Sequence, residues 1–160
     1  MIEQTLVLVK PDGVARGLIG GVIGRFEQRG LKIVGLKLVS IDKDFSKKHY
    51  SDHLDKDFYE GLEKFIVSGP VVAIVVEGVD AIENVRKLCG DTESKAALPG
   101  TIRGDYSHVS YSHADEKEIA IKNLIHASGN KEDAEKEVAL WFSIDELHSY
   151  KRAEDEHVLE

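Results

Sequence analysis

Hydrophobic residues in the first part of the chain switch between strand-like runs and helical stripes. Residues 5–9 form a short apolar run rich in β-branched side chains, and a Pro-Asp-Gly sequence at residues 11–13 ends it. This pattern predicts a buried strand followed by a turn. Between positions 19 and 26 the apolar residues recur at helical spacing, and Gly30 lies where a helix would end. Residues 31–39, rich in Ile, Val and Leu, predict a second strand.

The middle of the chain continues this alternation. Residues 42–65 are mixed in character and predict two short helices, which Ser68-Gly69-Pro70 would end. Residues 71–76, Val-Val-Ala-Ile-Val-Val, are the clearest strand in the sequence. Asp80 is expected to begin a further helix, because apolar residues at helical spacing follow it.

The last third of the chain predicts one long connection, one strand and one helix. The connection occupies residues 90–117, and residues 119–125 are expected to form a fourth strand. Asn130 can cap a last helix, and the highly charged tail after Tyr150 is expected to be loose. The predicted order, β-α-β-(αα)-β-α-β-α, suits an α+β ferredoxin-like sandwich, in which helices cover a four-stranded antiparallel sheet.

Composition narrows the class of protein. The chain has 160 residues, the usual size of one compact domain, so residues 1–160 are expected to form a single domain. Asp and Glu number 29 against 21 Lys and Arg, a formal net charge of −8. This balance argues against a dedicated nucleic-acid binder but allows nucleotides as substrates.

The cellular location is predicted from features that the sequence lacks. The single cysteine excludes an internal disulfide, and the start of the chain has no secretory signal. No stretch approaches the roughly 20 apolar residues that a membrane helix needs. A cytoplasmic location without membrane insertion is therefore expected.

Most familiar catalytic motifs are missing. The sequence contains no P-loop, no Gly-x-Gly-x-x-Gly fingerprint and no Gly-x-Ser-x-Gly elbow. It also lacks the paired Cys or His-Glu-x-x-His spacing of a protein metal site, so no metal held by the protein itself is expected. Polar residues at the ends of the predicted elements remain as candidates: Lys10, Arg86, Thr92, Thr101, Arg103, His126 and Glu137.

Taken singly, these candidates have ordinary interpretations. His126 is one of seven histidines, and most histidines lie on the surface or in the core without a catalytic role. Arg86 and Arg103 alone would be solvated charges, and Lys10 alone would be a polar stop after a buried strand. Cys89, on an apolar helical face, is expected to be a core residue.

Taken together, five stretches of the sequence resemble the nucleoside diphosphate kinase family. They are Val9-Lys10-Pro11-Asp12-Gly13-Val14, Arg25-Phe26-Glu27-Gln28-Arg29-Gly30, Ser68-Gly69-Pro70-Val71-Val72, Pro99-Gly100-Thr101-Ile102-Arg103-Gly104-Asp105 and Asn123-Leu124-Ile125-His126-Ala127-Ser128. Their order and spacing fit over residues 4–150, and the last stretch resembles the active-site signature of the family.

The resemblance implies a ferredoxin-like core and a ping-pong reaction. A nucleoside triphosphate would pass its γ-phosphate to a histidine and leave as the diphosphate, and a second diphosphate would then take the phosphate. His126 matches the nucleophile, which uses Nδ1, and Glu137 matches the glutamate that holds the other ring nitrogen. Side-chain chemistry agrees, because a carboxylate that accepts one ring N–H fixes which nitrogen attacks and stabilises the charge developing on the ring.

The resemblance also implies which residues bind the nucleotide. Arg86, Thr92 and Arg103 would hold the phosphates, where positioned cations stabilise the transferring phosphoryl group. Lys10 and Asn123 would bind the sugar 3′-hydroxyl, and Lys10 would also reach the phosphates.

Three further residues complete the implied site. Tyr50 would lie beside the histidine and Lys10, Phe58 would stack on the base, and Ser128 would hydrogen-bond Glu137. Mg²⁺ would arrive on the phosphates of the nucleotide. The partners would be nucleoside di- and triphosphates, and the family implies a homo-oligomer, either a hexamer, which is favoured, or a tetramer.

The chain departs from the family pattern in two places. Between Asp105 and Asn123 it is longer than the common pattern, with the extra residues at positions 110–118. Counting back from Asn123 assigns Ala120 to the base. After Ser128 the family commonly has Asp-Ser, whereas this chain has Gly-Asn, which changes the cap of the last helix.

Two other functions are alternatives to the kinase. A nucleotide-binding module without catalysis would be expected to have lost some of the matched polar residues, and none is missing. A protein-histidine phosphotransfer partner would carry its histidine exposed on a helix bundle, and the strand-rich pattern disfavours that arrangement.

Overall fold

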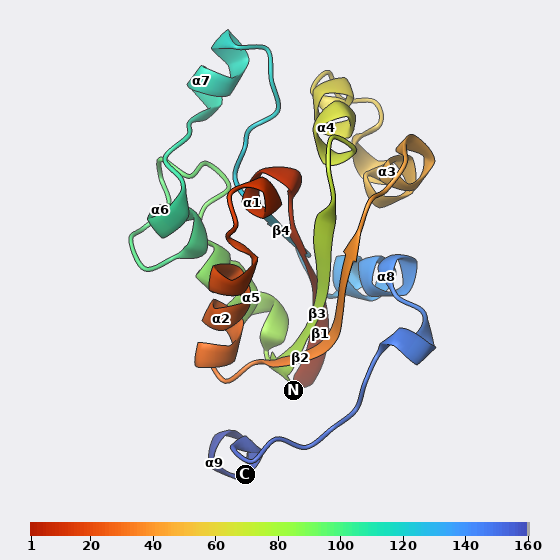
Figure 1. Cartoon of the computed structure of the whole chain (residues 1–160), viewed down its shortest axis with the longest axis vertical. Coiled ribbons are helices and arrows are strands. Elements are labelled where there is room, and N and C mark those ends of the chain that lie inside the picture. The colour runs from red at the N-terminus through yellow and green to blue at the C-terminus, as the bar shows by residue number, and fades with distance from the viewer. Residues whose placement is uncertain (160) are drawn as a thin grey trace.

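The computed structural model describes residues 1–159 and contains one four-stranded sheet in the order β2-β3-β1-β4. The strands are β1 (Ile2–Val9), β2 (Lys32–Val39), β3 (Val71–Val79) and β4 (Ile125–Ala127). Every neighbouring pair is antiparallel. This order confirms the predicted ferredoxin-like α+β sandwich (Figure 1).

The two central strands carry the core on both of their faces. Side chains alternate across a strand, so Val7 and Val9 of β1 face one layer while Leu6 and Leu8 face the other. All four are fully buried. Residues 5–9 and 71–76 are therefore apolar without interruption because helices cover both faces of the sheet.

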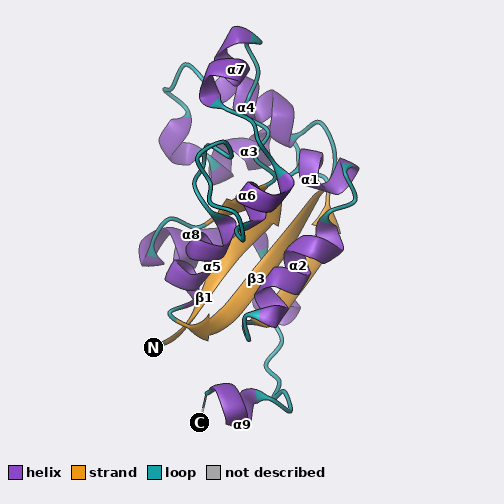
Figure 2. Cartoon of the chain, turned by 90° about the vertical axis from the view of Figure 1, so that its left-hand side faces the viewer, coloured by secondary structure: helices purple, strands orange, loops and turns teal. Residues whose placement is uncertain are grey.

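Helices cover the two faces of the sheet. On one face lie α2 (Ile19–Gln28) and α5 (Ala81–Cys89), whose apolar stripes pack against the sheet (Figure 2). The other face is covered by α3 (Lys43–His49), α4 (Tyr59–Ile66) and α8 (Lys131–Trp141). Short 3-10 turns lie at Ser51–His53 and Ile144–Glu146. The prediction of two short helices in residues 42–65 is confirmed.

Three short helices lie where the sequence predicted a turn or a connection. Pro11 begins α1 (Pro11–Ala15), because its fixed φ suits a first helical position. The side chain of Thr101 caps α6 (Ile102–Tyr106), and that of Ser110 caps α7 (Tyr111–Glu116). The predicted long connection is therefore partly helical.

The predicted fourth strand, residues 119–125, is wrong in position. The strand β4 is only Ile125–Ala127, and the residues before it are irregular. Leu124 has a φ of 73° and its carbonyl accepts the Lys10 N–H at 2.8 Å, which turns the chain as it enters the sheet. The apolar side chains of Ile119 and Ile121 face a cavity rather than the sheet. Their hydrophobicity was therefore misread as a strand pattern.

The prediction of a loose tail is also wrong. Tyr150 donates its hydroxyl to the Ile33 carbonyl at 2.6 Å, and α9 (Asp155–Val158) follows. Arg152 donates to the carbonyls of Gly30 and Leu31, at 2.8 and 3.0 Å. Its Nε donates to Asp155 at 3.0 Å.

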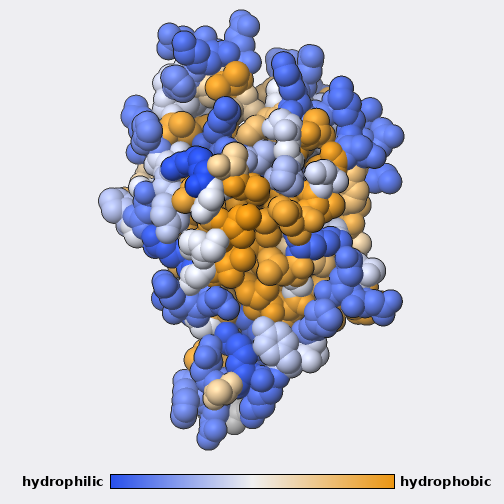
Figure 3. Space-filling model, in the orientation of Figure 1, coloured by the Kyte–Doolittle hydropathy of each residue, from blue (hydrophilic) through white to orange (hydrophobic). Residues whose placement is uncertain are grey.

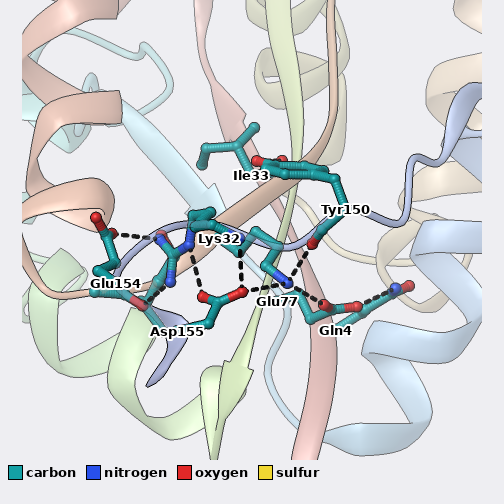
Figure 4. A network of polar contacts seen from close by, with 10 residues as sticks. Gln4, Lys32, Ile33, Glu77, Tyr150, Glu154 and Asp155 are labelled. Carbon is teal, nitrogen blue, oxygen red and sulfur yellow. Dashed lines mark hydrogen bonds and ion pairs between the residues drawn. The ribbon is translucent and has the colours of Figure 1, made fainter. Parts of the chain in front are cut away.

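Asp155 also lies 3.4 Å from the Lys32 ammonium group (Figure 4). Lys32, Arg152 and Asp155 are called the C-terminal ionic cluster below. The charged residues of the tail, which led to the prediction of a loose segment, in fact pair with groups at the start of β2.

Candidate active site

A cavity of about 910 Å³ opens near the ends of β1 and β4. Its lining comes from α4, α5 and the long connection before β4. Eight of the ten residues predicted for the site line this cavity: Lys10, Tyr50, Phe58, Arg86, Thr92, Arg103, Asn123 and His126. The other two, Ser128 and Glu137, lie behind His126.

Strand register places His126 against α8. His126 lies opposite Leu8 in the antiparallel pair of β1 and β4, so both side chains face the same side of the sheet. Leu8 belongs to the core layer under α8, whereas Ile125 and Ala127 belong to the opposite layer. His126 therefore meets a residue of α8, which is Glu137.

The imidazole of His126 has one engaged nitrogen and one free nitrogen. Its Nε2 lies 3.0 Å from both carboxylate oxygens of Glu137. The described residues form no hydrogen bond to Nδ1, and His126 lines the cavity. Nδ1 is therefore the nitrogen that a bound ligand can meet.

Glu137 is held in its ionised form. Burial opposes its ionisation, but the hydrogen bond from His126, the positive charge of that ring when protonated and the hydrogen bond from Ser128 together outweigh burial and lower the pKa of the carboxyl. The Ser128 hydroxyl donates to Glu137 at 2.6 Å. An anionic carboxylate accepts a hydrogen bond from the Nε2–H of His126. The ring proton therefore stays on Nε2, and the lone pair of the imidazole is on Nδ1.

Lys10 and Asn123 form a buried polar pair beside the histidine. The Lys10 ammonium group donates to the Asn123 side-chain carbonyl, and the Asn123 amide donates to the Thr92 backbone carbonyl at 2.7 Å. Burial lowers the pKa of Lys10 to about 8. These bonds fix an ammonium group and an amide at the wall of the cavity, where both can still bind an oxygen-rich ligand.

Arg103 has a structural role that the sequence did not predict. Its guanidinium donates to the backbone carbonyls of Gly90, Asn123 and Ile125 at 2.9, 3.1 and 2.7 Å. It thereby joins α6 to both ends of the connection and to β4. Arginine carries five N–H donors, so two remain for a ligand in the cavity.

Arg86 and Phe58 lie at more exposed positions of the cavity. Arg86 is exposed on α5, and Phe58, before α4, is 58% exposed. A charged group and an aromatic ring at the mouth can contact the phosphates and the base of a nucleotide without being fully desolvated beforehand.

One wall of the cavity was missed by the sequence analysis. Tyr111, Asp115 and Ile119 line it from the segment that is longer than the family pattern, and Ala120, which counting back from Asn123 assigns to the base, also lines it. A Cβ added at Gly61 of α4 would lie 3.7 Å from the Ala120 backbone nitrogen, so the segment passes close to this helix. The only available signal was the extra length itself, which indicated that residues were present but not where they fold.

A metal ion has one candidate group among residues 1–159. His49, His126 and Glu137 each offer a ligand atom, and these atoms lie within 4.8 Å of one another. However, Nε2 of His126 is bound to Glu137, and Nδ1 of His49 accepts the Trp141 indole N–H at 3.1 Å. One nitrogen of each ring is thus engaged, and the Glu137 carboxylate also accepts from Ser128, so the group fits a hydrogen-bonded cluster better than a metal centre.

The site as a whole has the chemistry of a nucleotide phosphotransferase. Cations and amides line the cavity for phosphate oxygens, an aromatic ring lies at its mouth, and a histidine offers an unshared nitrogen. The sequence model of the family described as nucleoside diphosphate kinase matches residues 3–147. The chain belongs to the nucleoside diphosphate kinase family.

Relatives and solved structures agree over nearly the whole chain. The chain is 53% identical to the nucleoside diphosphate kinase of Pyrococcus abyssi, over 96% of this chain and 92% of that protein. It is 49% identical to the enzyme of Borreliella burgdorferi, over 97% of this chain and 96% of that protein.

The structure is similar to that of a transition state mimic of the Borrelia burgdorferi enzyme with bound vanadate and ADP. The TM-score is 0.95 at 48% identity, covering 99% of this chain and 97% of that one. The structure is also similar to that of a halophilic nucleoside diphosphate kinase from Halobacterium salinarum in complex with CDP. The TM-score is 0.89 at 46% identity, and the match covers the whole of both chains.

Proposed function

We propose that the protein transfers the γ-phosphate of a nucleoside triphosphate to a nucleoside diphosphate through a phosphohistidine on His126. The observation that carries this proposal is the free Nδ1 of His126 in a cavity lined by cations, with Nε2 held by Glu137. The Nδ1 lone pair attacks the γ-phosphorus, and the bond to the β,γ-bridging oxygen breaks with its electrons going to the departing diphosphate. The Nε2 proton stays on the ring, hydrogen-bonded to Glu137. A second diphosphate reverses the step.

The cavity residues take the roles that their positions allow. Arg86, Thr92 and Arg103 would neutralise the phosphate oxygens as charge spreads over them in transfer. Lys10 and Asn123, already paired with each other, would bind the sugar 3′-hydroxyl, and the Lys10 ammonium group would reach the phosphates.

The remaining predicted residues orient the reacting groups. Tyr50 is buried and its ring contacts that of His49 edge to face, so its hydroxyl has a fixed position beside the cavity. Phe58 would stack on the base. Ser128 would hold the carboxylate of Glu137 through the 2.6 Å hydrogen bond.

Mg²⁺ would enter on the phosphates of the nucleotide. Carboxylates of Glu83, Asp91 and Asp115 line the cavity, but as a set they are not gathered into a metal cage among the described residues. A hydrated ion held by phosphate oxygens fits such a lining, because Mg²⁺ keeps several of its waters. Bound there, it would neutralise phosphate charge.

We infer that the protein forms a homo-oligomer, with a hexamer favoured over a tetramer. Leu36 and Leu38, on the edge strand β2, are 52% and 62% exposed. Figure 3 shows a broad apolar area on the face of the molecule where β2 runs in Figure 1. An open strand edge with exposed leucines is costly in water, and a second copy of the chain would cover it.

Other expectations remain predictions from the sequence. None of the helices within residues 1–159 has the length and apolar character that crossing a membrane requires. The cytoplasmic location, the single domain and the absence of dedicated nucleic-acid binding stay predictions.

A phosphate-exchange assay tests the proposed function. The chain is mixed with ATP, Mg²⁺ and GDP, and formation of GTP is measured. Exchange is expected in the parent and in His113→Gln, an exposed histidine on α7, and is expected to be lost in His126→Gln. Nucleotide binding without exchange in the parent would instead support a binding module.

A further inference from the structure

His49 is a buried histidine that lies behind the candidate nucleophile. It ends α3, is 8% exposed and does not line the cavity. The indole N–H of Trp141 donates to its Nδ1 at 3.1 Å. Indole can only donate, so Nδ1 of His49 must be the acceptor, and the proton of the neutral ring is fixed on Nε2.

The remaining N–H of His49 has no hydrogen-bond partner. Its Nε2 is buried and unpaired. An unpaired buried donor costs stability, so its retention calls for an explanation. Moving the proton from Nε2 to Nδ1 would not remove this cost, because Nδ1 needs its lone pair to accept the hydrogen bond from Trp141.

His49 lies directly against the catalytic pair. Its ring meets that of His126 edge to face, with centroids 4.8 Å apart and planes at 81°. A His49 nitrogen lies within 4.8 Å of a nitrogen of His126 and a carboxylate oxygen of Glu137. The His49 ring therefore belongs to the same small cluster as the proposed nucleophile and its carboxylate.

Burial, aided by nearby positive groups, keeps the His49 ring neutral. Burial, chiefly, lowers its pKa to about 3, and His126 on β4, His53 on the 3-10 turn and Lys10 at the end of β1 act in the same direction. Glu137 on α8 opposes them. Tyr50, next along the chain, has a pKa raised by burial and stays protonated. At neutral pH His49 therefore presents a fixed dipole rather than a charge.

We propose that His49 is a positioning residue for the pair of His126 and Glu137, and that Trp141 fixes the tautomer in which the positive N–H end of the His49 ring favours the ionised carboxylate. This proposal rests on the proposed function, since it concerns how the nucleophile is prepared. The role explains why a buried N–H is left without a partner: a full hydrogen bond to Glu137 would compete with the one from His126. The dipole acts on Glu137 without taking its oxygen away from the imidazole.

The test compares His49→Phe with His49→Gln by rapid-mixing measurement of His126 phosphorylation. The Phe variant keeps an aromatic ring but has no N–H, whereas the Gln variant can place an amide N–H near the position of Nε2. His49→Phe is expected to slow phosphorylation by about tenfold at neutral pH, with little change in KM for the nucleotide. His49→Gln is expected to recover most of that loss.

The pH profile separates this role from simple packing. Losing the dipole raises the pKa of Glu137, which lies below its ordinary 4.5 in the parent, so the slowing in His49→Phe relative to the parent should grow as the pH falls from about 6 to about 4. A slowing that does not change over this range, no slowing at all, or a Gln variant as slow as the Phe variant would overturn the proposal.

Nitrogen NMR of the parent protein gives a test that needs no variant to fold. His49 should show one neutral tautomer, protonated on Nε2, between about pH 6 and about pH 8. A mixture of tautomers, or a ring that titrates in this range, would overturn the inference. A parent that never labels His126 would instead refute the proposed function, which keeps the two failures distinct.

Discussion

Two buried polar clusters lie at opposite ends of the sheet, and they use their hydrogen-bonding capacity differently. In the C-terminal ionic cluster, Arg152 donates from all three of its side-chain nitrogens, and both oxygens of Asp155 accept hydrogen bonds. In the cluster around His126, Nδ1 of the imidazole faces the cavity unbonded, and Nε2 of His49 has no partner.

The difference indicates what each cluster does. A saturated cluster can only hold chain segments together, and this one fastens the end of the chain to the start of β2. A cluster with an unused lone pair and an unused donor has capacity left for a substrate and for charge that develops during a reaction. Variants of the C-terminal ionic cluster should therefore change stability and leave the rate unchanged, whereas variants of the cluster around His126 should change the rate.

The largest effect on rate, apart from loss of His126, is expected for Glu137→Gln. The variant keeps the shape of the side chain but removes the charge that the ring needs as it becomes cationic. A hydrogen bond to a charged group contributes about 1.5–3 kcal/mol, so phosphorylation should slow by about tenfold to hundredfold. Pre-steady-state phosphorylation and nucleotide binding are measured together. Weakened binding with an unchanged rate would make Glu137 a structural residue.

The opposite result is expected for Asp155→Asn. Loss of the charge removes the ion pairs with Arg152 and Lys32, so Tm should fall at neutral pH while the transfer rate stays at the parental value. Glu156→Gln, an exposed neighbour, is the matched control and should change neither.

The effect of Asp155→Asn on Tm is expected to depend on pH. Hydrogen bonds from Arg152, the backbone N–H first, lower the pKa of Asp155 below its ordinary 3.8. The contribution of the ionised carboxylate is therefore present above that value and is lost as the pH falls through the lowered pKa. The difference in Tm between the parent and Asp155→Asn should shrink in strong acid. A constant difference would show that the charge is not what stabilises this cluster.

The smallest effect is expected when the base of the acceptor is changed. Phe58 can stack on any base, and stacking contributes about 1–3 kcal/mol with little regard to identity. The kcat/KM values for ADP, GDP, CDP, UDP and dTDP should therefore lie within about tenfold, or 1.4 kcal/mol. A 3′-deoxy acceptor should be much poorer, because Lys10 and Asn123 would lose their partner. A thousand-fold preference for one base, or no penalty for the 3′-deoxy compound, would contradict this account of the cavity.

The pattern of apolar residues along the chain was enough to predict the fold, but not which residues form the wall of the cavity. Residues 5–9 and 71–76 were recognisable as strands because the core uses them on both faces. Residues 119–121 have the same apolar character but line the cavity, and a pattern of hydrophobicity does not distinguish a core from a pocket wall. The tail was misjudged because its charges pair with groups more than a hundred positions earlier.

The site shows the same limit. The motifs identified eight cavity residues and the pair of Ser128 and Glu137, since each lies within a recognisable stretch or at a matched spacing. His49 was missed because its significance depends on Trp141, which lies 92 positions further along the chain. Such a contact becomes visible only when α3 and α8 are placed side by side on the sheet.

The most direct measurement of the central claim is to map the phosphate on the protein. The chain is incubated with γ-labelled ATP and Mg²⁺, freed of nucleotide and digested. The label is expected on His126, stable in alkali and lost in acid as a phosphoramidate should be, present in His113→Gln and absent in His126→Gln. Label that persists in His126→Gln, or that maps to another residue of the parent, would contradict the account.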